Sequence, residues 1–323
     1  MFRLLALIVP ILLLLCATDA QSQTFLGTRG RSLGGAYRAV ATGSDAIYAN
    51  PAGIIQIPRY ATELHYNFDL YDDLHQGNFT LVDSKTSVVG VGLGYNLKLE
   101  DLASDRFSVK NEATGALAYT IIPKIFSVGA AFKYVNLTDA IAGNYLNALS
   151  ADVGLLATLP GGVNLAAVGY NLVPIKSSEV PISAAFAASW NLGPLSALIM
   201  GGTPTWGPTI DASGAIKPPN PMNPAGMLDG LVLSLDWYIE FFTLYGPQNE
   251  VSAGVEYLIL QTVPVRAGYT WNQHGDEHVL SVGAGFIVPT FGLDVAYQQS
   301  VTDFDDRNFS VSIKFFLDFL VGM

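Results

Sequence analysis

The chain has almost no cysteine. Its single cysteine, Cys16, lies in an N-terminal stretch in which Arg3, the apolar run Leu4 to Leu15 and the small-residue site Thr18-Asp19-Ala20 are typical of a secretory signal peptide. We expect cleavage before Gln21, which removes residues 1–20. A lipid anchor on Cys16 is the weaker alternative, because a leucine precedes it where lipoprotein processing requires a small residue. Without Cys16 the mature chain forms no disulfide, uses no thiol nucleophile and builds no cysteine-ligated metal site.

Charge and long apolar runs are also scarce. Only 13% of the residues are charged, although 50% are hydrophobic, whereas an ordinary soluble domain carries about 25% charged residues. Beyond the signal peptide no apolar run reaches the roughly 18 residues that a membrane-spanning helix requires. A closed β-barrel is the other structure that satisfies its backbone groups in lipid. The composition therefore favours membrane-spanning strands.

The few charges that are present are mostly acidic. Lysine and arginine total 16, against 27 aspartate and glutamate residues. This excess of negative charge argues against nucleic acid as a partner and against attraction to an anionic membrane surface.

From Tyr60 onward the sequence consists of segments of about ten residues in which apolar and polar positions alternate. Thr62, Leu64, Tyr66, Phe68 and Leu70 share one face of the first segment, and Glu63, His65, Asn67 and Asp69 share the other. The same alternation recurs in further segments, among them those centred near residues 80, 94, 119, 130, 154, 186, 234, 254, 268, 283, 296 and 311. Repeated alternating segments separated by turns are typical of an outer-membrane barrel.

Alternation alone leaves a soluble β-sandwich or a lipocalin-like barrel open, since these also have one apolar face per strand. Three features favour the membrane barrel: a polar face of Gly, Ala, Ser, Thr and Asn, tyrosine and tryptophan near segment ends, and connections that alternate between short and long. We therefore predict an all-β fold, a transmembrane antiparallel barrel in a bacterial outer membrane.

The turns set the number of strands. Short turns are expected at 123–124, 160–162, 261–262 and 289–290, with longer outer loops at 100–106, 137–147, 171–179, 272–277 and 300–307. Fifteen segments alternate, but single-chain bacterial barrels have an even number of strands. We predict fourteen strands, with 193–230 as an irregular insertion rich in proline and glycine; sixteen, using Leu195 to Gly202 and a further partner, is the alternative.

Residues 21–57 do not alternate and are small and glycine-rich. We expect Asp45 to cap a helical turn that runs through Tyr48 and that Pro51 brings to an end. The side chain of Asn50 can then hydrogen-bond a freed backbone group. A plain surface turn is the alternative for Asn50-Pro51-Ala52-Gly53, but its position just before the first strand favours a specific role.

Two runs of sequence resemble the FadL/PorV superfamily of outer-membrane barrels. In the N-terminal segment they are Gly34-Gly35-Ala36-Tyr37-Arg38-Ala39-Val40-Ala41 and Asp45-Ala46-Ile47-Tyr48-Ala49-Asn50-Pro51-Ala52-Gly53, with a spacing closer to the PorV-like branch. Gly254-Val255-Glu256-Tyr257, Val265-Arg266-Ala267-Gly268-Tyr269 and Leu293-Asp294-Val295-Ala296-Tyr297 extend the resemblance toward the C-terminus. The resemblance implies a fourteen-stranded barrel plugged by an N-terminal hatch. It divides the chain into a signal peptide (1–20), a hatch (21–57) and a barrel (58–323).

The resemblance implies two functions of different classes. FadL-like members pass hydrophobic molecules such as fatty acids, while PorV-like members serve a protein-secretion system as scaffolds or carriers. In the first case Gly34, Gly35, Asn50, Pro51, Ala52 and Gly53 would form the gate. The short outer loops of this chain depart from the long-loop capture groove of FadL-like transporters. We favour the passive channel and keep the secretion scaffold as the alternative.

The lumen should be polar in part, and no enzyme is expected. By parity, Asp236 points inward together with Glu63, His65, Asn67, Lys98, Lys133, Asp152, Glu256, Arg266 and Asp294. Glu256 and Arg266 should pair across a hairpin, either to brace the wall or to hold the hatch. His65 is the best catalytic candidate for a hydrolase, a minor alternative, but a satisfied lumen residue is the simpler interpretation. We expect no cofactor, no metal and no catalytic residue, a monomer, and outer-membrane lipid and hydrophobic small molecules as partners.

Overall fold

We analysed the chain in a computed structural model that describes residues 25–69, 73–100, 107–139, 144–174, 180–193, 209–210, 216–217, 230–241, 246–260 and 262–317. The expected signal peptide and the segment Leu195 to Gly202 lie outside these residues. Within the described part of the chain, no helix has the length and apolarity needed to cross a membrane.

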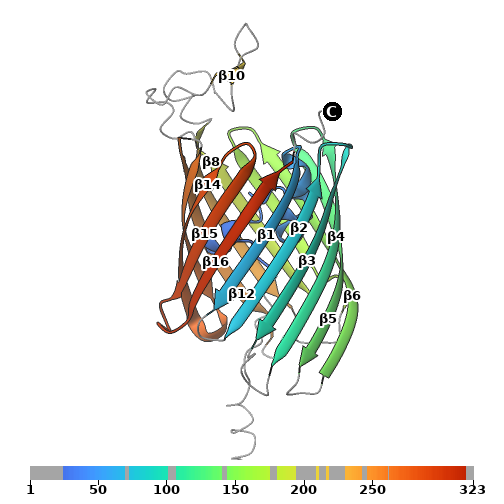
Figure 1. Cartoon of the computed structure of the whole chain (residues 1–323), viewed down its shortest axis with the longest axis vertical. Coiled ribbons are helices and arrows are strands. Elements are labelled where there is room, and N and C mark those ends of the chain that lie inside the picture. Colours follow the sequence, from blue (N-terminus) through green and yellow to red (C-terminus); the bar gives the residue numbers. More distant parts are fainter. Residues whose placement is uncertain are drawn as a thin grey trace, which may run out of the picture.

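Fourteen antiparallel strands form a closed barrel, which confirms the predicted fold and strand number (Figure 1). Each strand pairs with its neighbour in sequence, β8 pairs with β11, and β1 closes on β16. The strands are β1 (Tyr60–Asp69), β2 (Leu74–Asp83), β3 (Val89–Glu100), β4 (Ser108–Ile122), β5 (Phe126–Asp139), β6 (Asn144–Leu159), β7 (Val163–Tyr170), β8 (Ser183–Asn191), β11 (Leu231–Glu240), β12 (Gln248–Ile259), β13 (Val263–Asn272), β14 (Glu277–Ile287), β15 (Phe291–Ser300) and β16 (Arg307–Phe316).

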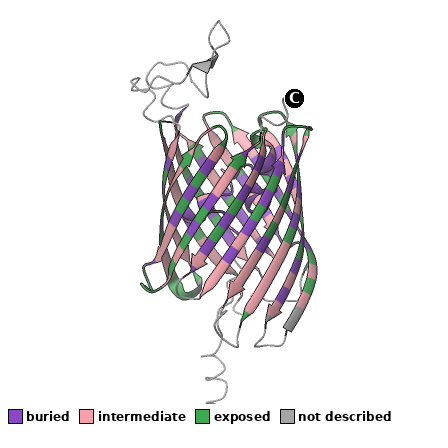
Figure 2. Cartoon of the chain, viewed as in Figure 1, coloured by how far each residue is buried: buried purple, intermediate pink, exposed green. Residues whose placement is uncertain are grey.

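The barrel is apolar outside and polar inside. Large apolar side chains such as Leu64, Leu93 and Phe132 are exposed on its outer face, while Asn67, Thr80 and Ser252 are buried on the inner face. Figure 2 shows buried residues alternating with more exposed ones along strands such as β1 and β2. Because side chains alternate across a strand, the period of two in the sequence becomes a lipid-facing surface and a polar lumen.

One predicted loop is more regular than expected. Strands β5 and β6 extend into the loop expected at 137–147, because Leu137 pairs with Leu146 and Asp139 with Asn144. The hydrogen-bonded pairing of the strands thus extends beyond the turn residues from which we predicted the strand ends. Only short pieces of the segment 193–230, which we predicted to be irregular, are described, and the prediction for the segment remains untested. There Thr209–Ile210 (β9) and Ile216–Lys217 (β10) pair in a small two-stranded sheet beyond one end of the barrel (Figure 1).

The described part of the N-terminal segment lies inside the barrel (Figure 1). It contains two short helices, α2 (Thr28–Ser32) and α3 (Ala46–Ala49), and a 3₁₀ helix, η1 (Pro51–Gln56). Helix α2 contacts β13 to β16, and η1 contacts β3 to β6, on the far side of the lumen. We call residues 25–56 the hatch. The domain boundaries proposed from the sequence remain a prediction.

The helical turn predicted after Asp45 forms, but the Asp45 side chain does not cap it. Helix α3 begins after Asp45 and ends at Ala49, and Asn50 is extended (φ −160°) before Pro51 starts η1. The carboxylate of Asp45 makes no capping hydrogen bond. It reaches the barrel wall instead, because ionic partners in the lumen hold a carboxylate more strongly than one backbone N–H does.

Candidate functional site

The hatch fits the wall through glycines on the lumen face of the strands. A Cβ atom added to Gly268 would lie 2.1 Å from the backbone carbon of Leu33, and one added to Gly129 would lie 2.3 Å from that of Pro51. The same holds around the barrel for Gly92 against Ile47, Gly94 against Tyr48, Gly154 against Asn50, Gly254 against Leu33 and Gly283 against Ser32. Because contacts below 3 Å force atoms to move, a side chain at any of these positions would shift hatch atoms, and at Gly129 and Gly268 these are backbone atoms. We call these seven glycines the glycine seat.

Apolar side chains of the hatch fill the space that the seat leaves. Ile47 and Ile54 are fully buried, and they cluster with Ala116, Ala118 and Ala131 of the wall. Small residues on the lumen face thus allow side chains of the hatch to approach the strands closely, and dispersion contacts and burial stabilise the docked position.

Asn50 joins two parts of the hatch to the wall. Its amide nitrogen donates to the carbonyl oxygens of Arg38 and of Leu155 in β6, each at 3.2 Å, and its Oδ1 accepts from Ala52 N at 3.1 Å. The sequence-based prediction that Asn50 binds a freed backbone group is therefore confirmed. Pro51 and Ala52 lie against Gly129.

The other residues predicted at the gate, Gly34, Gly35 and Gly53, lie where the backbone has a positive φ angle or leaves no room for a side chain. Gly34 and Gly35 have positive φ angles of 63° and 84°. The hydroxyl of Thr270 donates to the carbonyl oxygen of Gly34. A Cβ on Gly53 would meet the carbonyl oxygen of Ala41 at 2.1 Å. A role for these residues in gating remains a proposal.

The carboxylate of Asp236 in β11 binds both backbone N–H groups and an arginine side chain of the hatch. Its Oδ2 accepts from the N–H groups of Tyr37 and Arg38 at 3.1 and 3.0 Å, and the Arg38 guanidinium lies 3.2 Å away. Arg38 also donates to the Tyr170 hydroxyl at 2.8 Å and stacks over the Tyr238 ring. Both charges are almost completely buried, so each depends on the other for stabilisation.

A second ionic connection runs along β12, β13, β15 and β16. Arg29 of the hatch binds Glu256 with two nitrogens, at 2.9 and 2.7 Å. Arg266 bridges Glu256 at 2.5 Å and Asp294 at 2.6 Å, and Lys314 lies 3.7 Å from Asp294. The predicted Glu256–Arg266 pair is thus present across the hairpin. It also touches the hatch, so bracing the wall and holding the hatch are combined.

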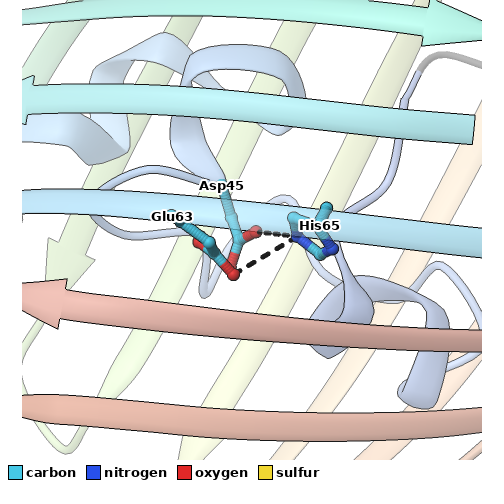
Figure 3. Close-up of side chains that lie close together, drawn as sticks. All are labelled: Asp45, Glu63 and His65. Atoms are coloured by element: carbon cyan, nitrogen blue, oxygen red, sulfur yellow. Dashed lines mark ion pairs between the residues drawn. The ribbon is translucent and has the colours of Figure 1, made fainter.

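The connection ends in a buried cluster of Asp45, Glu63 and His65 (Figure 3). His65 Nε2 lies 3.6 Å from Asp45 Oδ1 and 3.3 Å from Glu63 Oε1, and its Nδ1 contacts Thr28 Oγ1 at 2.9 Å. Lys314 Nζ lies 3.0 Å from Asp45 and 3.3 Å from Glu63. Burial alone would raise the pKa of the Asp45 carboxyl, but the Lys314 ammonium and His65 hold that pKa well below its usual range.

The ligand atoms of Asp45, Glu63 and His65 lie close enough together to hold a metal ion, although we expected no metal site. The ammonium group of Lys314 already supplies a cation there. The connected groups contain four carboxylates and three cations. These groups are Asp45, Glu63, Glu256, Asp294, Arg29, Arg266 and Lys314.

His65 also has a hydroxyl and a carboxylate on opposite sides, as a hydrolase would require. However, Thr28 is completely buried and His65 is 6% exposed. A substrate could reach these atoms only after the hatch had left the lumen. The arrangement therefore holds the hatch to β1 in the docked state.

Of the remaining predicted lumen residues, Lys133, Asp152 and Lys98 take part in ion pairs outside the hatch, whereas Asn67 contacts the hatch. Lys133 binds Asp152 at 2.8 Å and Asn171 at 2.7 Å. Lys98 pairs with Glu100 at 2.5 Å and is partly exposed. With its amide oriented to satisfy its neighbours, Asn67 accepts from Arg31 of the hatch at 3.3 Å.

Arg31 is a buried cation held mainly by amides. Its guanidinium donates to Gln298 and Gln76 at 3.2 Å each. Burial lowers the pKa of Arg31 to about 10, while the charge of Asp69 opposes that shift. Arg29, Arg31 and Arg38 are thus three arginines of the hatch that contact polar side chains of the lumen.

Sequence reasoning missed the glycine seat, the three arginines and Lys314. Signals for all of them are present. The seat glycines occupy lumen parity in their strands, and Lys314 alternates with Ile313 and Phe315. Acidic lumen positions also outnumber the basic ones predicted beside them, which calls for cations from elsewhere in the chain.

Replacing Arg266 should loosen the hatch. In Arg266→Ala, Asp294 loses its closest cation while 1% exposed and keeps Lys314 at 3.7 Å. Removing one partner of a buried ion pair costs about 3–5 kcal/mol. We expect higher conductance in planar lipid bilayers than for the unmodified chain. Lys98→Ala is the control, because an exposed pair contributes about 0–1 kcal/mol. Unchanged conductance of Arg266→Ala would mean that the pair only braces the wall.

The sequence matches no protein-family model, and no curated protein sequence is similar to it. Solved structures do resemble it. The CymD monoaromatic hydrocarbon channel has 13% identity and a TM-score of 0.62, over 90% of this chain and 97% of that one. The Pseudomonas putida toluene transporter TodX has 12% identity and a TM-score of 0.62, over 93% and 100%. A Pseudomonas aeruginosa FadL homologue has 12% identity and a TM-score of 0.56, over 92% and 99%.

At these identities the likeness concerns the fold. It spans nearly the whole of both chains in each comparison, and it agrees with the family resemblance found in the sequence. Two of the three neighbours are described as a channel or a transporter, and none as an enzyme. The chain therefore has the fold of the FadL-family outer-membrane channels, a closed fourteen-stranded barrel with an N-terminal segment before its first strand.

Proposed function

We propose that this chain is a passive outer-membrane channel for small hydrophobic compounds and that the hatch gates it. The observation that carries the proposal is how the hatch is attached. No residue of the hatch pairs with the wall in a β-ladder among the described strands, and side-chain contacts and close packing hold it instead. The hatch can therefore shift while the hydrogen-bonded wall stays intact, as gating requires.

The shared fold supports this class of cargo. CymD is described as a monoaromatic hydrocarbon channel and TodX as a toluene transporter. We extend hydrophobic cargo to this chain, with monoaromatic hydrocarbons and fatty acids as the candidates. Gly34, Gly35, Asn50, Pro51, Ala52 and Gly53 would form the gate. Outer-membrane lipid surrounds the barrel, which we expect to be a monomer.

Uptake by a deletion strain tests this proposal. Cells that lack the gene should accumulate labelled toluene or labelled fatty acid more slowly than the parent, and a plasmid copy should restore the rate. The rate for a small hydrophilic solute serves as the control and should not change. Unchanged uptake of every hydrophobic probe would contradict the channel.

A secretion scaffold of the PorV-like kind is the second candidate. The extent of buried ionic contacts between hatch and wall favours it, because a carrier that transports nothing can keep its lumen permanently closed. In that case the deletion strain would take up hydrophobic probes normally and would fail to release secreted proteins.

A further inference from the structure

Two hairpins of the barrel carry the same three polar residues at the same spacing. Tyr66, Asp73 and His75 lie on the hairpin of β1 and β2, with Asp73 seven residues and His75 nine residues after the tyrosine. On the hairpin of β13 and β14, Tyr269 is followed at the same intervals by Asp276 and His278. We call these two sets the hairpin triads.

Their register and backbone geometry are also the same. His75 lies opposite Phe68, two residues after Tyr66, and His278 lies opposite Trp271, two residues after Tyr269. Asp73 and Asp276 have positive φ angles of 44° and 52°, which non-glycine residues seldom adopt. Two hairpins far apart in sequence therefore place the carboxylate and the imidazole in the same way.

In each triad the tyrosine orients the histidine ring. The phenol oxygen lies 2.7 Å from Nδ1 of His75 in the first triad and 2.6 Å from Nδ1 of His278 in the second. When Nδ1–H donates to this oxygen, Nε2 keeps its lone pair. This is the outer contact that a metal-binding histidine usually makes, since a partner at one nitrogen fixes the ring for coordination through the other.

In each triad, Nε2 of the histidine lies about as far from Oδ1 of the aspartate as two ligands of one metal ion lie from each other. Nε2 of His75 lies 3.4 Å from Oδ1 of Asp73, and Nε2 of His278 lies 3.7 Å from Oδ1 of Asp276. From the usual zinc–nitrogen and zinc–oxygen distances, two ligands of a tetrahedral ion lie about 3.3–3.5 Å apart. The first triad fits this without change, and the second fits after a shift of a few tenths of an ångström.

The triads are also accessible, and in the second triad the aspartate has a further partner. The side chains of His75 and His278 are 29% and 39% exposed, and those of Asp73 and Asp276 are 47% and 81% exposed. Trp271 Nε1 donates to Asp276 Oδ1 at 2.9 Å. Solvent can therefore deliver an ion and complete its coordination with water.

Other hairpins show what the same position holds without a histidine. Tyr95 bonds Asn111 at 2.6 Å and Tyr134 bonds Asn147 at 2.8 Å, each across the same diagonal of the ladder. An asparagine thus satisfies the tyrosine fully. In the two triads a histidine occupies this position, and an aspartate lies beside it.

We propose that each hairpin triad binds one divalent ion of the zinc class, through Nε2 of the histidine and Oδ1 of the aspartate, with water in the remaining positions. Imidazole and carboxylate together suit such an ion. In each hairpin the two ligands lie at the start of the second strand, and the tyrosine of the first strand contacts the histidine. These sites are separate from the buried Asp45, Glu63 and His65 cluster and do not depend on transport.

Calorimetric titration of the purified full barrel with zinc chloride, in a detergent free of phosphate, tests the proposal. We expect two ions per chain, one fewer for His75→Asn or His278→Asn, and none for the double variant. Asparagine keeps the tyrosine bonded, as it does at Tyr95, so these variants should fold normally. Tyr66→Phe should weaken one site by about 10-fold or more, because the outer contact is lost.

Two results would overturn the proposal. The absence of saturable binding by the unmodified barrel would leave the triads as ordinary surface ion pairs. Undiminished zinc binding by the double variant would place the ions elsewhere, with the His65 cluster as the alternative. The double variant's heat-unfolding curve, compared with that of the unmodified barrel without zinc, confirms that both are folded.

Discussion

Gly268→Leu should expel the hatch from the lumen and leave the barrel open. The new Cβ would lie 2.1 Å from the Leu33 carbonyl carbon and 2.3 Å from Gly34 N, and neither is the end of a flexible side chain. Overpacking typically costs about 1–3 kcal/mol, and here the backbone itself must move. We expect steady open pores in planar bilayers where the unmodified chain is closed. The fourteen-stranded wall should survive, because its ladders do not involve the hatch.

Trypsin provides an independent measurement for this variant. Arg31 and Arg38 are buried between hatch and wall, so they should resist cleavage in the unmodified barrel and become cleavable in Gly268→Leu. Gly115→Leu is the matched control, because a Cβ on Gly115 meets only Leu93 Cδ2, at 3.8 Å, among the lipid-facing side chains. Equal conductance and equal cleavage of both variants would mean that the glycine seat does not position the hatch.

Asp236→Ala should be the most damaging change among the ionic contacts. It leaves the Arg38 guanidinium unpaired at 3% exposure and removes the acceptor of two backbone N–H groups. Removing one partner of a buried pair costs about 3–5 kcal/mol. Hydrogen exchange of Tyr37 and Arg38 amides should accelerate by several orders of magnitude.

Asp236→Asn separates charge from hydrogen bonding at this position. Its amide oxygen can still accept from the N–H groups of Tyr37 and Arg38, so exchange should lie between the unmodified chain and Asp236→Ala. If Asp236→Ala exchanged as slowly as the unmodified chain, the hatch would be held without this contact.

The barrel could be predicted from the sequence because its physics is local and periodic. Alternation identified the lipid face through residues such as Leu64 and Tyr66, and it placed Glu256 and Arg266 on the lumen face of neighbouring strands, opposite or diagonal to each other. Turn residues gave the short connections, and the requirement for an even number of strands led to fourteen. The ends of β5 and β6 could not be predicted this way, because ladder pairing extends strands beyond their clear alternation.

The contacts of the hatch were less predictable because they join residues far apart in the chain. Asp45 was predicted to cap a helix because its neighbours Ala46 to Tyr48 are local in the sequence. Its partner Lys314 is 269 residues away and could not be inferred from the sequence. Gly129 and Gly268 looked like small lumen residues, since their role depends on the backbone that approaches them. Asn50 was predicted correctly because its partner Ala52 lies two residues away.

Movement of the hatch can be tested most directly by locking it. Thr28 Oγ1 lies 2.8 Å from Ser310 Oγ in β16, so cysteines at both positions should be able to form a disulfide across hatch and wall. Once Cys16 is removed with the signal peptide, no other cysteine competes. The proposed function predicts that oxidised Thr28→Cys/Ser310→Cys cells stop taking up labelled toluene and recover on reduction, while Thr28→Cys alone responds to neither treatment. Equal uptake by the oxidised and reduced double variant would contradict a channel gated by its hatch.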